Sequence, residues 1–256
     1  MNICIDVGNS TIGIGVFKEN KLIERKIADT NLDYTVEDFY EIFKKPFAVA
    51  LDDEELVNII YSSVVPQING NLLMAIKKFT DVEPLLINPK TVTDLAVDVD
   101  NPSEIGNDLI ADLVGAKEKY RFPCLIADLG TASKILLLDE SGTFTSCLIM
   151  PGLTLSAESL SNKAALLPEV PLTMPKSIMA SNTLSAMNAG IIYGHADMIL
   201  GLTKRYEDEL GYPCTHILTG GGAVYLKDIL QNDFVYDQNL NLDGLNIIIS
   251  KNIKEE

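Results

Sequence analysis

Two segments of the chain repeat one short pattern, and this duplication constrains the fold more than any other feature of the sequence. Residues 5–11 read Ile-Asp-Val-Gly-Asn-Ser-Thr, and residues 127–133 read Ala-Asp-Leu-Gly-Thr-Ala-Ser. Each is an apolar run that ends in an aspartate, followed by a glycine turn with small hydroxyl side chains and a second apolar run. The pattern predicts a strand, a tight turn and a second strand. Two such turns that face each other can hold a polyphosphate and its magnesium ion.

The elements expected around the two segments follow the same order in both halves of the chain. Strand trios are expected at 2–8, 11–18 and 21–28, and again at 124–128, 133–139 and 143–150. A trio followed by alternating helices and strands, used twice, indicates an α/β fold with two lobes of related topology, residues 1–120 and 121–256. Since no linker or low-complexity tract divides the lobes, we expect them to pack closely around a shared cleft.

Later elements place further candidate residues. A helix is predicted from Pro102–Glu104 to about residue 120, with Ser103 as its cap. Residues 182–210 have the pattern of a long helix, and a short strand precedes the glycine-rich segment 219–223. The apolar run 245–249 fits more than one type of element.

Charge and composition exclude several classes of function. The 256 residues include 20 Lys and Arg against 36 Asp and Glu, a net charge of −16 at pH 7. This charge repels phosphate backbones and anionic lipids, so we expect neither nucleic-acid nor membrane binding as the main role. No apolar run is long enough to span a membrane, and the first residues lack the basic region of a signal peptide. The sequence thus predicts a cytoplasmic protein.

The cysteines and histidines give little support for a zinc centre or a Ser-His-Asp triad. Four cysteines without C-x-x-C spacing are interpreted as reduced, mostly buried thiols: Cys4, Cys124, Cys147 and Cys214. His195 and His216 are the only histidines. His195 falls within a long helix pattern and is interpreted as a core or interface residue rather than a catalyst.

Asp6 and Asp128 are the leading candidates for ligand binding. A carboxylate at the end of a buried strand is costly to desolvate unless it meets a cation or several donors. A single aspartate of this kind more often caps a turn, whereas two in matching contexts favour a binding role. Their oxygen-rich, histidine-poor setting suits magnesium or a monovalent cation better than zinc. Gly8 and Gly130 allow the backbone to approach phosphate oxygens without a Cβ in the way.

Further candidates lie in the turns and at a helix start. Side chains that add donors to the backbone amides are Asn9, Ser10, Thr11, Thr131 and Ser133. The Thr219–Gly222 segment is either a loop that needs positive φ or a platform for a nucleoside, and the two aspartate turns favour the nucleotide contact. Asp108, at the first turns of the expected helix, is either a partner of the helix dipole or a general base for an attacking hydroxyl.

With these motifs in order along its whole length, the chain resembles the type III pantothenate kinases of the acetate and sugar kinase/Hsp70/actin superfamily. Residues 6–10, Asp-Val-Gly-Asn-Ser, look like the family's D-x-G-N-T motif, and residues 128–133 are similar to its D-x-G-T-A-T motif. Pro151–Ser156 looks like the P-G-x-x-x-S stretch of the family. Asn182-Thr183, with Gly-Ile-Ile-Tyr-Gly at 190–194, resembles its N-T…S-G-I-x-Y-G segment.

The resemblance implies two ribonuclease H-like, actin-like ATPase lobes around a nucleotide cleft. The implied activity is ATP-dependent phosphorylation of pantothenate to 4′-phosphopantothenate, the first step of coenzyme A biosynthesis. A homodimer, magnesium with ATP, and a monovalent cation (K⁺ or NH4⁺) are implied as well. The residues assigned to ATP are Asp6, Val7, Gly8, Asn9, Ser10, Thr11, Ile12, Gly13 and Thr131. Those assigned to pantothenate are Gly106, Asn107, Asp108, Leu109 and Thr183, with Asp108 as proton acceptor. The metal ligands are Asp6 and, for the monovalent cation, Asp128.

The sequence departs from the family pattern at two positions. The pattern around Asp108 is usually G-x-D-R, but Leu109 replaces the arginine, and Val99 replaces a tyrosine seven residues before Gly106. Arginine supplies forked, charged donors for a carboxylate or phosphate, and leucine supplies none. Two alternatives therefore stay open: a catalytically impaired, nucleotide-binding regulatory homologue, and a kinase of a different small hydroxyl-bearing metabolite. The short chain disfavours a third, an actin-like filament protein.

Overall fold

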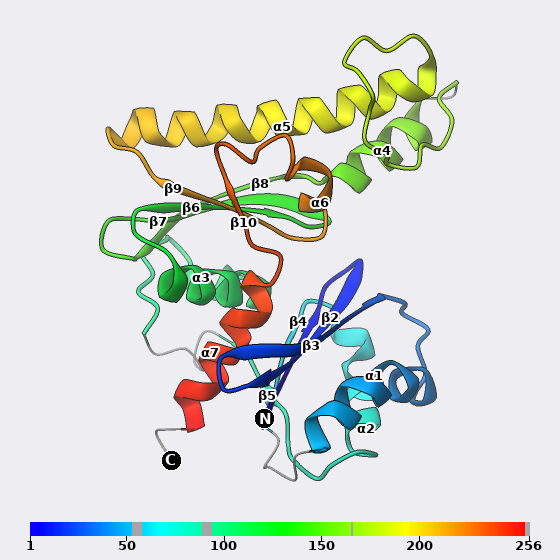
Figure 1. The fold of residues 1–256 in the computed structure, drawn as a ribbon, viewed down its shortest axis with the longest axis vertical. Helices are drawn as coiled ribbons and strands as arrows, with labels where there is room; N and C mark the ends of the chain where they lie inside the picture. Colours follow the sequence, from blue (N-terminus) through cyan, green and yellow to red (C-terminus); the bar gives the residue numbers. More distant parts are fainter. Residues whose placement is uncertain (53–57, 89–93, 165, 254–256) are drawn as a thin grey trace. The chain divides into compact units, whose positions relative to one another are not determined.

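Two compact units divide the chain in the computed structural model (Figure 1). The structure describes residues 1–52, 58–88, 94–164 and 166–253. The first unit comprises Met1–Lys119 together with the chain from Asn239 onward, and the second comprises Tyr120–Gln238. Within the described residues, each unit holds a five-stranded sheet.

The first sheet has the strand order β3-β2-β1-β4-β5. Its strands are β1 (Asn2–Val7), β2 (Thr11–Lys18), β3 (Lys21–Asp29), β4 (Asn58–Ser63) and β5 (Leu85–Leu86). The first three are antiparallel neighbours, whereas β4 runs parallel to β1 and β5 parallel to β4. The carboxyl ends of β1 and β4 therefore meet at one edge of the sheet, where ligands of α/β proteins commonly bind.

The second sheet repeats this arrangement, which confirms the predicted duplication. Its strands are β6 (Cys124–Leu129), β7 (Ala132–Leu138), β8 (Phe144–Pro151), β9 (Thr215–Thr219) and β10 (Val235–Tyr236). The order β8-β7-β6-β9-β10 matches the first sheet strand for strand, with an antiparallel trio followed by two parallel strands. Both trios lie where the sequence predicts them to within one residue. The fold is the expected α/β type with two related lobes.

Helices cover both faces of the first sheet (Figure 1). On one face α1 (Val36–Leu51) packs with α2 (Asn69–Ile76), and on the other α3 (Asn107–Lys119) packs along α7 (Leu240–Ile253). Alternate strand residues point to opposite faces. Ile3 therefore joins the apolar cluster under α1, while Cys4 joins the cluster under α7.

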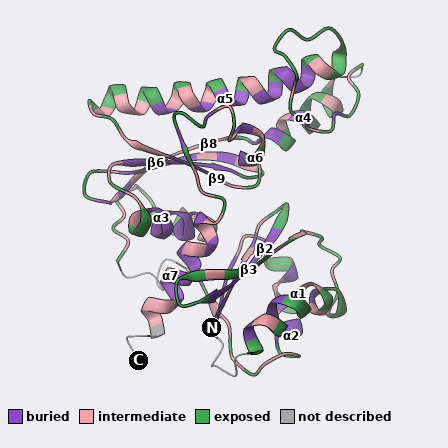
Figure 2. Cartoon of the chain, viewed as in Figure 1, coloured by how far each residue is buried: buried purple, intermediate pink, exposed green. Residues whose placement is uncertain are grey.

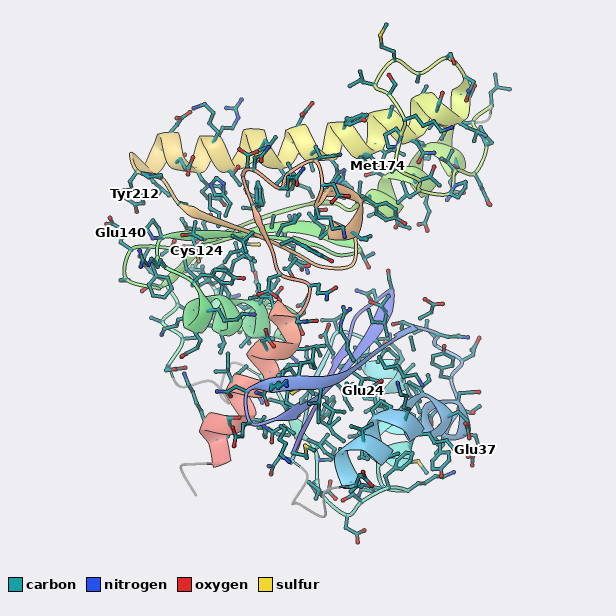
Figure 3. All side chains as sticks on the ribbon, in the orientation of Figure 1. Glu24, Glu37, Cys124, Glu140, Met174 and Tyr212 are labelled. Carbon is teal, nitrogen blue, oxygen red and sulfur yellow. The ribbon has the colours of Figure 1, made fainter. Side chains whose placement is uncertain are left out.

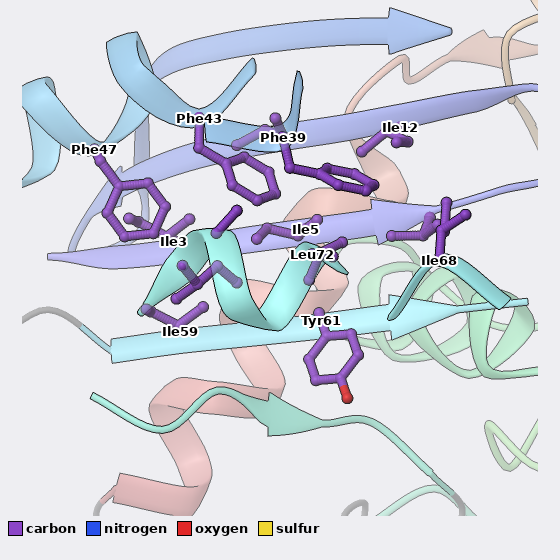
Figure 4. Packing of buried hydrophobic residues seen from close by; sticks show 14 of the residues in the cluster. Ile3, Ile5, Ile12, Phe39, Phe43, Phe47, Ile59, Tyr61, Ile68 and Leu72 are labelled. Atoms are coloured by element: carbon purple, nitrogen blue, oxygen red, sulfur yellow. The ribbon is translucent and has the colours of Figure 1, made fainter. Parts of the chain in front are cut away.

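Helix α1 illustrates why these residues fold as they do. Thr35 caps its start, because its side chain accepts a hydrogen bond from Asp38 N–H and its own N–H donates to the Asp38 carboxylate at 2.9 Å. Phe39, Phe43 and Phe47 recur every four residues and are fully buried against the strands (Figure 4). Burial of each ring contributes roughly 1.5–3 kcal/mol.

In the second unit, α5 (Thr183–Leu210) lies across one face of the sheet and contacts α4 (Leu153–Lys163) and α6 (Ala223–Leu226) (Figure 1). Ile192 and Ile199 on α5 share a buried cluster with Ala127 of β6. Asn182 caps the start of α5, and Gly211 ends it with a φ of 82°. Neither α5 nor any other described helix is both long and apolar enough to cross a membrane.

The helix predicted from Ser103 begins later than expected, so the predicted cap is wrong. Pro102–Glu104 forms a short 3-10 turn, and Ile105 is extended with a ψ of 120°. The Ser103 hydroxyl donates to Asn101 Oδ1 at 2.6 Å instead of capping a helix. Helix α3 starts at Asn107. This later start places Asp108 in the first turn of the helix.

The C-terminal apolar run forms helix α7 and belongs to the first unit, although it lies within residues 121–256, the predicted bounds of the second lobe. Leu240 and Leu245 are fully buried there. Gly244 allows α7 to lie directly on α3, since a Cβ at this position would overlap the carbonyl oxygen of Ala111. Gly115 on α3 allows the same close approach from the other helix, since a Cβ on it would lie 2.5 Å from the carbonyl oxygen of Leu240.

Candidate functional site

The first acidic hairpin joins β1 to β2 through residues 8–11. Gly8 N–H donates to the carbonyl oxygen of Thr11 at 2.9 Å, which closes the turn. Thr30, just after β3, supports it: its N–H donates to Ser10 O at 2.9 Å and its hydroxyl donates to Gly8 O at 2.7 Å. Asn9, Ser10 and Thr11 are exposed. The tip therefore offers amide and hydroxyl donors to a ligand.

Asp6 lies two positions before this turn and is half-buried. Its side chain is directed to the sheet face that α3 and α7 cover, because side chains alternate along β1. Its partner on β2 is Gly13, and a Cβ built on Gly13 would have Leu242 as its nearest neighbour, at 4.0 Å. No side chain therefore crowds the carboxylate from that position. Val7 and Ile12 are fully buried, so only their backbone reaches the turn.

The second acidic hairpin joins β6 to β7, and there the aspartate is paired with a lysine. Asp128 and Lys134 are directly opposite in register, and Lys134 Nζ donates to Asp128 Oδ2 at 2.8 Å. The side chains are only 11% and 15% exposed. Sequence reasoning missed Lys134. Its position in the sequence could have revealed it. Asp128 and Lys134 are each three residues from Thr131 at the hairpin tip, and residues equally far from a tip face each other across the two strands.

The glycine loop after β9 contacts Asp128. Strand β9 runs parallel to β6 and pairs Thr219 with Asp128. Gly222 N–H donates to Leu129 O at 2.7 Å. Gly220 has a φ of +87°, and a Cβ there would lie 2.5 Å from Asp128 Oδ1 and 2.6 Å from Leu129 N. Position 220 therefore requires glycine, which brings bare backbone against the acidic turn.

The segment before α4 meets the same turn. Gly152 N–H donates to the carbonyl oxygen of Thr131 at 3.0 Å. A Cβ on Gly152 would overlap the carbonyl oxygens of Gly130 and Thr131. Thr131 itself is exposed. Glycines from three segments of the second unit thus bring backbone together at the carboxyl end of β6.

Ser133 does not face the turn, so the expectation that it adds a donor there is wrong. It is fully buried, and its Oγ lies 3.1 Å from His195 Nε2 on α5. Burial lowers the pKa of His195, although a backbone hydrogen bond with Pro151 opposes the shift. His195 is thus a buried residue, as predicted, and supports the strand behind the turn.

Asp108 lies in the first turn of α3 and is half-buried. Its carboxylate folds back over Gly106, since a Cβ on that glycine would lie 2.5 Å from Asp108 Oδ1. Asn241 Nδ2 donates to the Asp108 backbone carbonyl at 3.1 Å, which ties the helix start to α7. Leu109 is buried, 8% exposed, and therefore points an apolar side chain into the protein.

The predicted site residues are divided between the two units. Asp6–Gly13 and Gly106–Leu109 belong to the first unit, whereas Asp128, Thr131 and Thr183 belong to the second. Asp128 and Thr131 come together at the end of β6. Thr183 lies on a different element, as the exposed first residue of α5.

Comparison with known sequences identifies a family. The family model described as type III pantothenate kinase matches residues 2–205. A type III pantothenate kinase from Brevibacillus brevis is 34% identical over 253 residues, which cover 98% of this chain and 99% of that protein. One from Exiguobacterium sibiricum is 35% identical, with 98% and 100% covered.

Comparison with solved structures supports the fold alone. A Campylobacter jejuni protein assigned to the Baf family of transcriptional activators matches with a TM-score of 0.60 at 16% identity, covering 98% of this chain and 99% of that one. A Sinorhizobium meliloti protein assigned as a 2-dehydro-3-deoxygalactonokinase matches with a TM-score of 0.59 at 10% identity and the same coverage. An archaeal actin homologue gives 0.52 at 11% identity, again covering 98% and 99%. The two lobes therefore have the fold of actin-like ATPases and sugar kinases.

Proposed function

This chain belongs to the type III pantothenate kinase family, and we propose which of its residues carry out the reaction. The reaction is the ATP-dependent phosphorylation of pantothenate to 4′-phosphopantothenate, the first step of coenzyme A biosynthesis. The observation that carries the residue assignment is the pair of Asp-x-Gly hairpins, one in each repeat of the fold. Phosphoryl transfer depends mainly on positioning and charge neutralisation, which turns of this kind can provide.

ATP is assigned to residues 6–13 and to Thr131. Exposed hydroxyls and backbone amides at these turns are the donors that phosphates require. Asp6 is assigned to hold magnesium, which neutralises charge on the phosphates, and the absence of a side chain at Gly13 supports this role. No three His, Cys, Asp or Glu side chains gather into a metal site within the described part of the chain. Magnesium is commonly bound by one or two carboxylates together with water and substrate phosphates, so Asp6 alone can anchor it.

Asp108 is assigned as the proton acceptor. The pantothenate hydroxyl oxygen forms a bond to the γ-phosphorus, the bond from phosphorus to the β,γ-bridging oxygen breaks, and ADP leaves. The hydroxyl proton passes to the Asp108 carboxylate and then to solvent. Pantothenate is assigned to Gly106, Asn107, Leu109 and Thr183. Because the Leu109 side chain is buried, its part is limited to its backbone.

We further assign a homodimer and a cytoplasmic location. Large apolar side chains are exposed along α4, the loop after it and the start of α5 (Figures 2 and 3): Leu155, Leu160, Leu166, Met174, Ile178, Met179 and Leu184. Such a concentration is typical of a protein interface, and sedimentation equilibrium measures whether two copies associate.

The cytoplasmic assignment is supported by the cysteines. All four are free thiols, as expected in a reducing compartment.

The test of the function couples ADP release to a spectroscopic signal, with pantothenate and other hydroxyl-bearing metabolites as acceptors. We expect turnover with pantothenate to exceed turnover with the other acceptors. Calorimetric titration with MgADP accompanies the assay. Nucleotide binding without turnover on any acceptor would favour a regulatory homologue, and turnover on another acceptor alone would change the substrate.

A further inference from the structure

A lysine ammonium lies where the resemblance to the kinase family implies a monovalent cation. Lys134 Nζ lies 2.8 Å from Asp128 Oδ2, the usual length of a charge-assisted hydrogen bond. The pairing follows from the strand register, since the two residues are opposite each other on β7 and β6. Both side chains are largely shielded from water, which strengthens the attraction and limits its screening by salt.

The first hairpin shows that the repeated motif does not need this lysine. Its equivalent residues are Asp6 and Gly13, opposite each other on β1 and β2. Both hairpins have the same place in their sheets and both carry a glycine turn after the aspartate. A lysine directly opposite the aspartate is therefore a feature of the second hairpin and not of both repeats.

We propose that the Lys134 ammonium serves as a built-in monovalent cation at Asp128, so that phosphoryl transfer by this protein requires no added K⁺ or NH4⁺. The inference rests on the proposed function, in which the turn after Asp128 holds nucleotide phosphate. One ammonium balances the charge of one carboxylate beside that turn. A potassium ion placed against the same carboxylate would be repelled by the ammonium already there. Lys134 is a positioning residue, because it acts through Asp128 and the turn that follows.

The first test measures pantothenate phosphorylation in choline chloride, sodium chloride, potassium chloride and ammonium chloride at equal ionic strength. The wild-type rate is expected to agree within about twofold among the four salts. Lys134→Met should lose at least about tenfold in choline and regain most of it in potassium or ammonium. Lys134→Arg keeps a cation at this position and should stay independent of the added ion.

A second readout does not depend on turnover. Calorimetry measures the affinity of the wild type and of Lys134→Met for MgADP in choline and in potassium. Potassium should tighten binding to the variant several-fold and leave the wild type unchanged. The matched control is Lys204→Met, which removes an exposed lysine paired with Asp208 on α5 and should behave as wild type.

The outcomes separate this inference from the function on which it rests. Activation of the wild type by potassium of about tenfold or more would overturn the built-in cation while leaving the kinase intact. A Lys134→Met variant that is less stable but equally active in every salt would overturn it too, since the pair would then be purely structural. Absence of phosphopantothenate in all four salts would reject the proposed function, and the MgADP titrations would still decide the role of Lys134.

Discussion

The two repeated aspartates differ in the residue that is opposite them on the next strand, which is Gly13 for the first and Lys134 for the second. One side chain thus changes the chemistry of a repeated motif. The motifs predicted the aspartates and the glycine turns, because strand ends, turns and buried acids have strong local signals. The contacts of Lys134 and Ser133 were not predicted. The Lys134 contact follows from the register of the β6–β7 hairpin, which is set only once the hairpin tip is known. The Ser133 contact depends on the position of α5, which a single sequence does not give.

Replacing Asp108 by Asn tests its role as proton acceptor. The amide has nearly the same shape but cannot take the hydroxyl proton, so kcat should fall by about 10²–10⁴-fold. Affinity for MgADP, measured by calorimetry, should change little. The matched control is Asp98→Asn, an exposed acid in the same unit, which should retain full activity. A kcat for Asp108→Asn close to the wild-type value would show that the base has been misassigned.

Replacing Gly220 by Ala tests the backbone platform beside Asp128. Its φ of +87° and the 2.6 Å approach to Leu129 N leave no place for a Cβ, so the variant should lose about 1–3 kcal/mol of stability in urea unfolding. Its affinity for MgADP should fall as well. Gly221→Ala is the control for stability, because no atom lies within 4 Å of a Cβ there. Equal stability of the two variants would argue against the tight loop.

At the scale of elements, the sequence predicted both strand trios and the long helix α5, and the misses have local causes. The start signal at Pro102–Glu104 predicted one helix, but the extended Ile105 interrupts the hydrogen-bond ladder and separates the short 3-10 turn from α3. Strand β10 has only two residues, too few for a periodic signal. Helix α7 was ambiguous because a short apolar run fits a strand or a helix, and its glycine at 244 weakens the helical signal.

Gly244→Ala tests the contact between α7 and α3. In an exposed helix this change would add stability, because Ala is the better helix former by about 1 kcal/mol. Here the Cβ would overlap the Ala111 carbonyl, so we expect a loss of about 1–3 kcal/mol in urea unfolding. Gly201→Ala on α5 is the opposite case, with no atom within 4 Å, and should be neutral or stabilising. A stabilising effect at 244 would contradict the close packing.

At the scale of the whole molecule, two repeats of one topology supply the residues assigned to a single reaction. The duplication was predictable, since the same motif recurs in the same order of elements. The return of α7 to the first unit was not, because an apolar run does not reveal which sheet it will cover. The activity was predicted from motifs that follow the family's order along the whole chain, and the family match supports that prediction.

Direct transfer of phosphate to pantothenate is best tested with ATP labelled with ¹⁸O in its γ-phosphoryl group. Mass spectrometry should find the three non-bridging γ-oxygens of the labelled ATP in 4′-phosphopantothenate. The amount of this product should equal the amount of ADP. Release of ADP with the label in inorganic phosphate, or nucleotide binding without labelled 4′-phosphopantothenate, would contradict a pantothenate kinase.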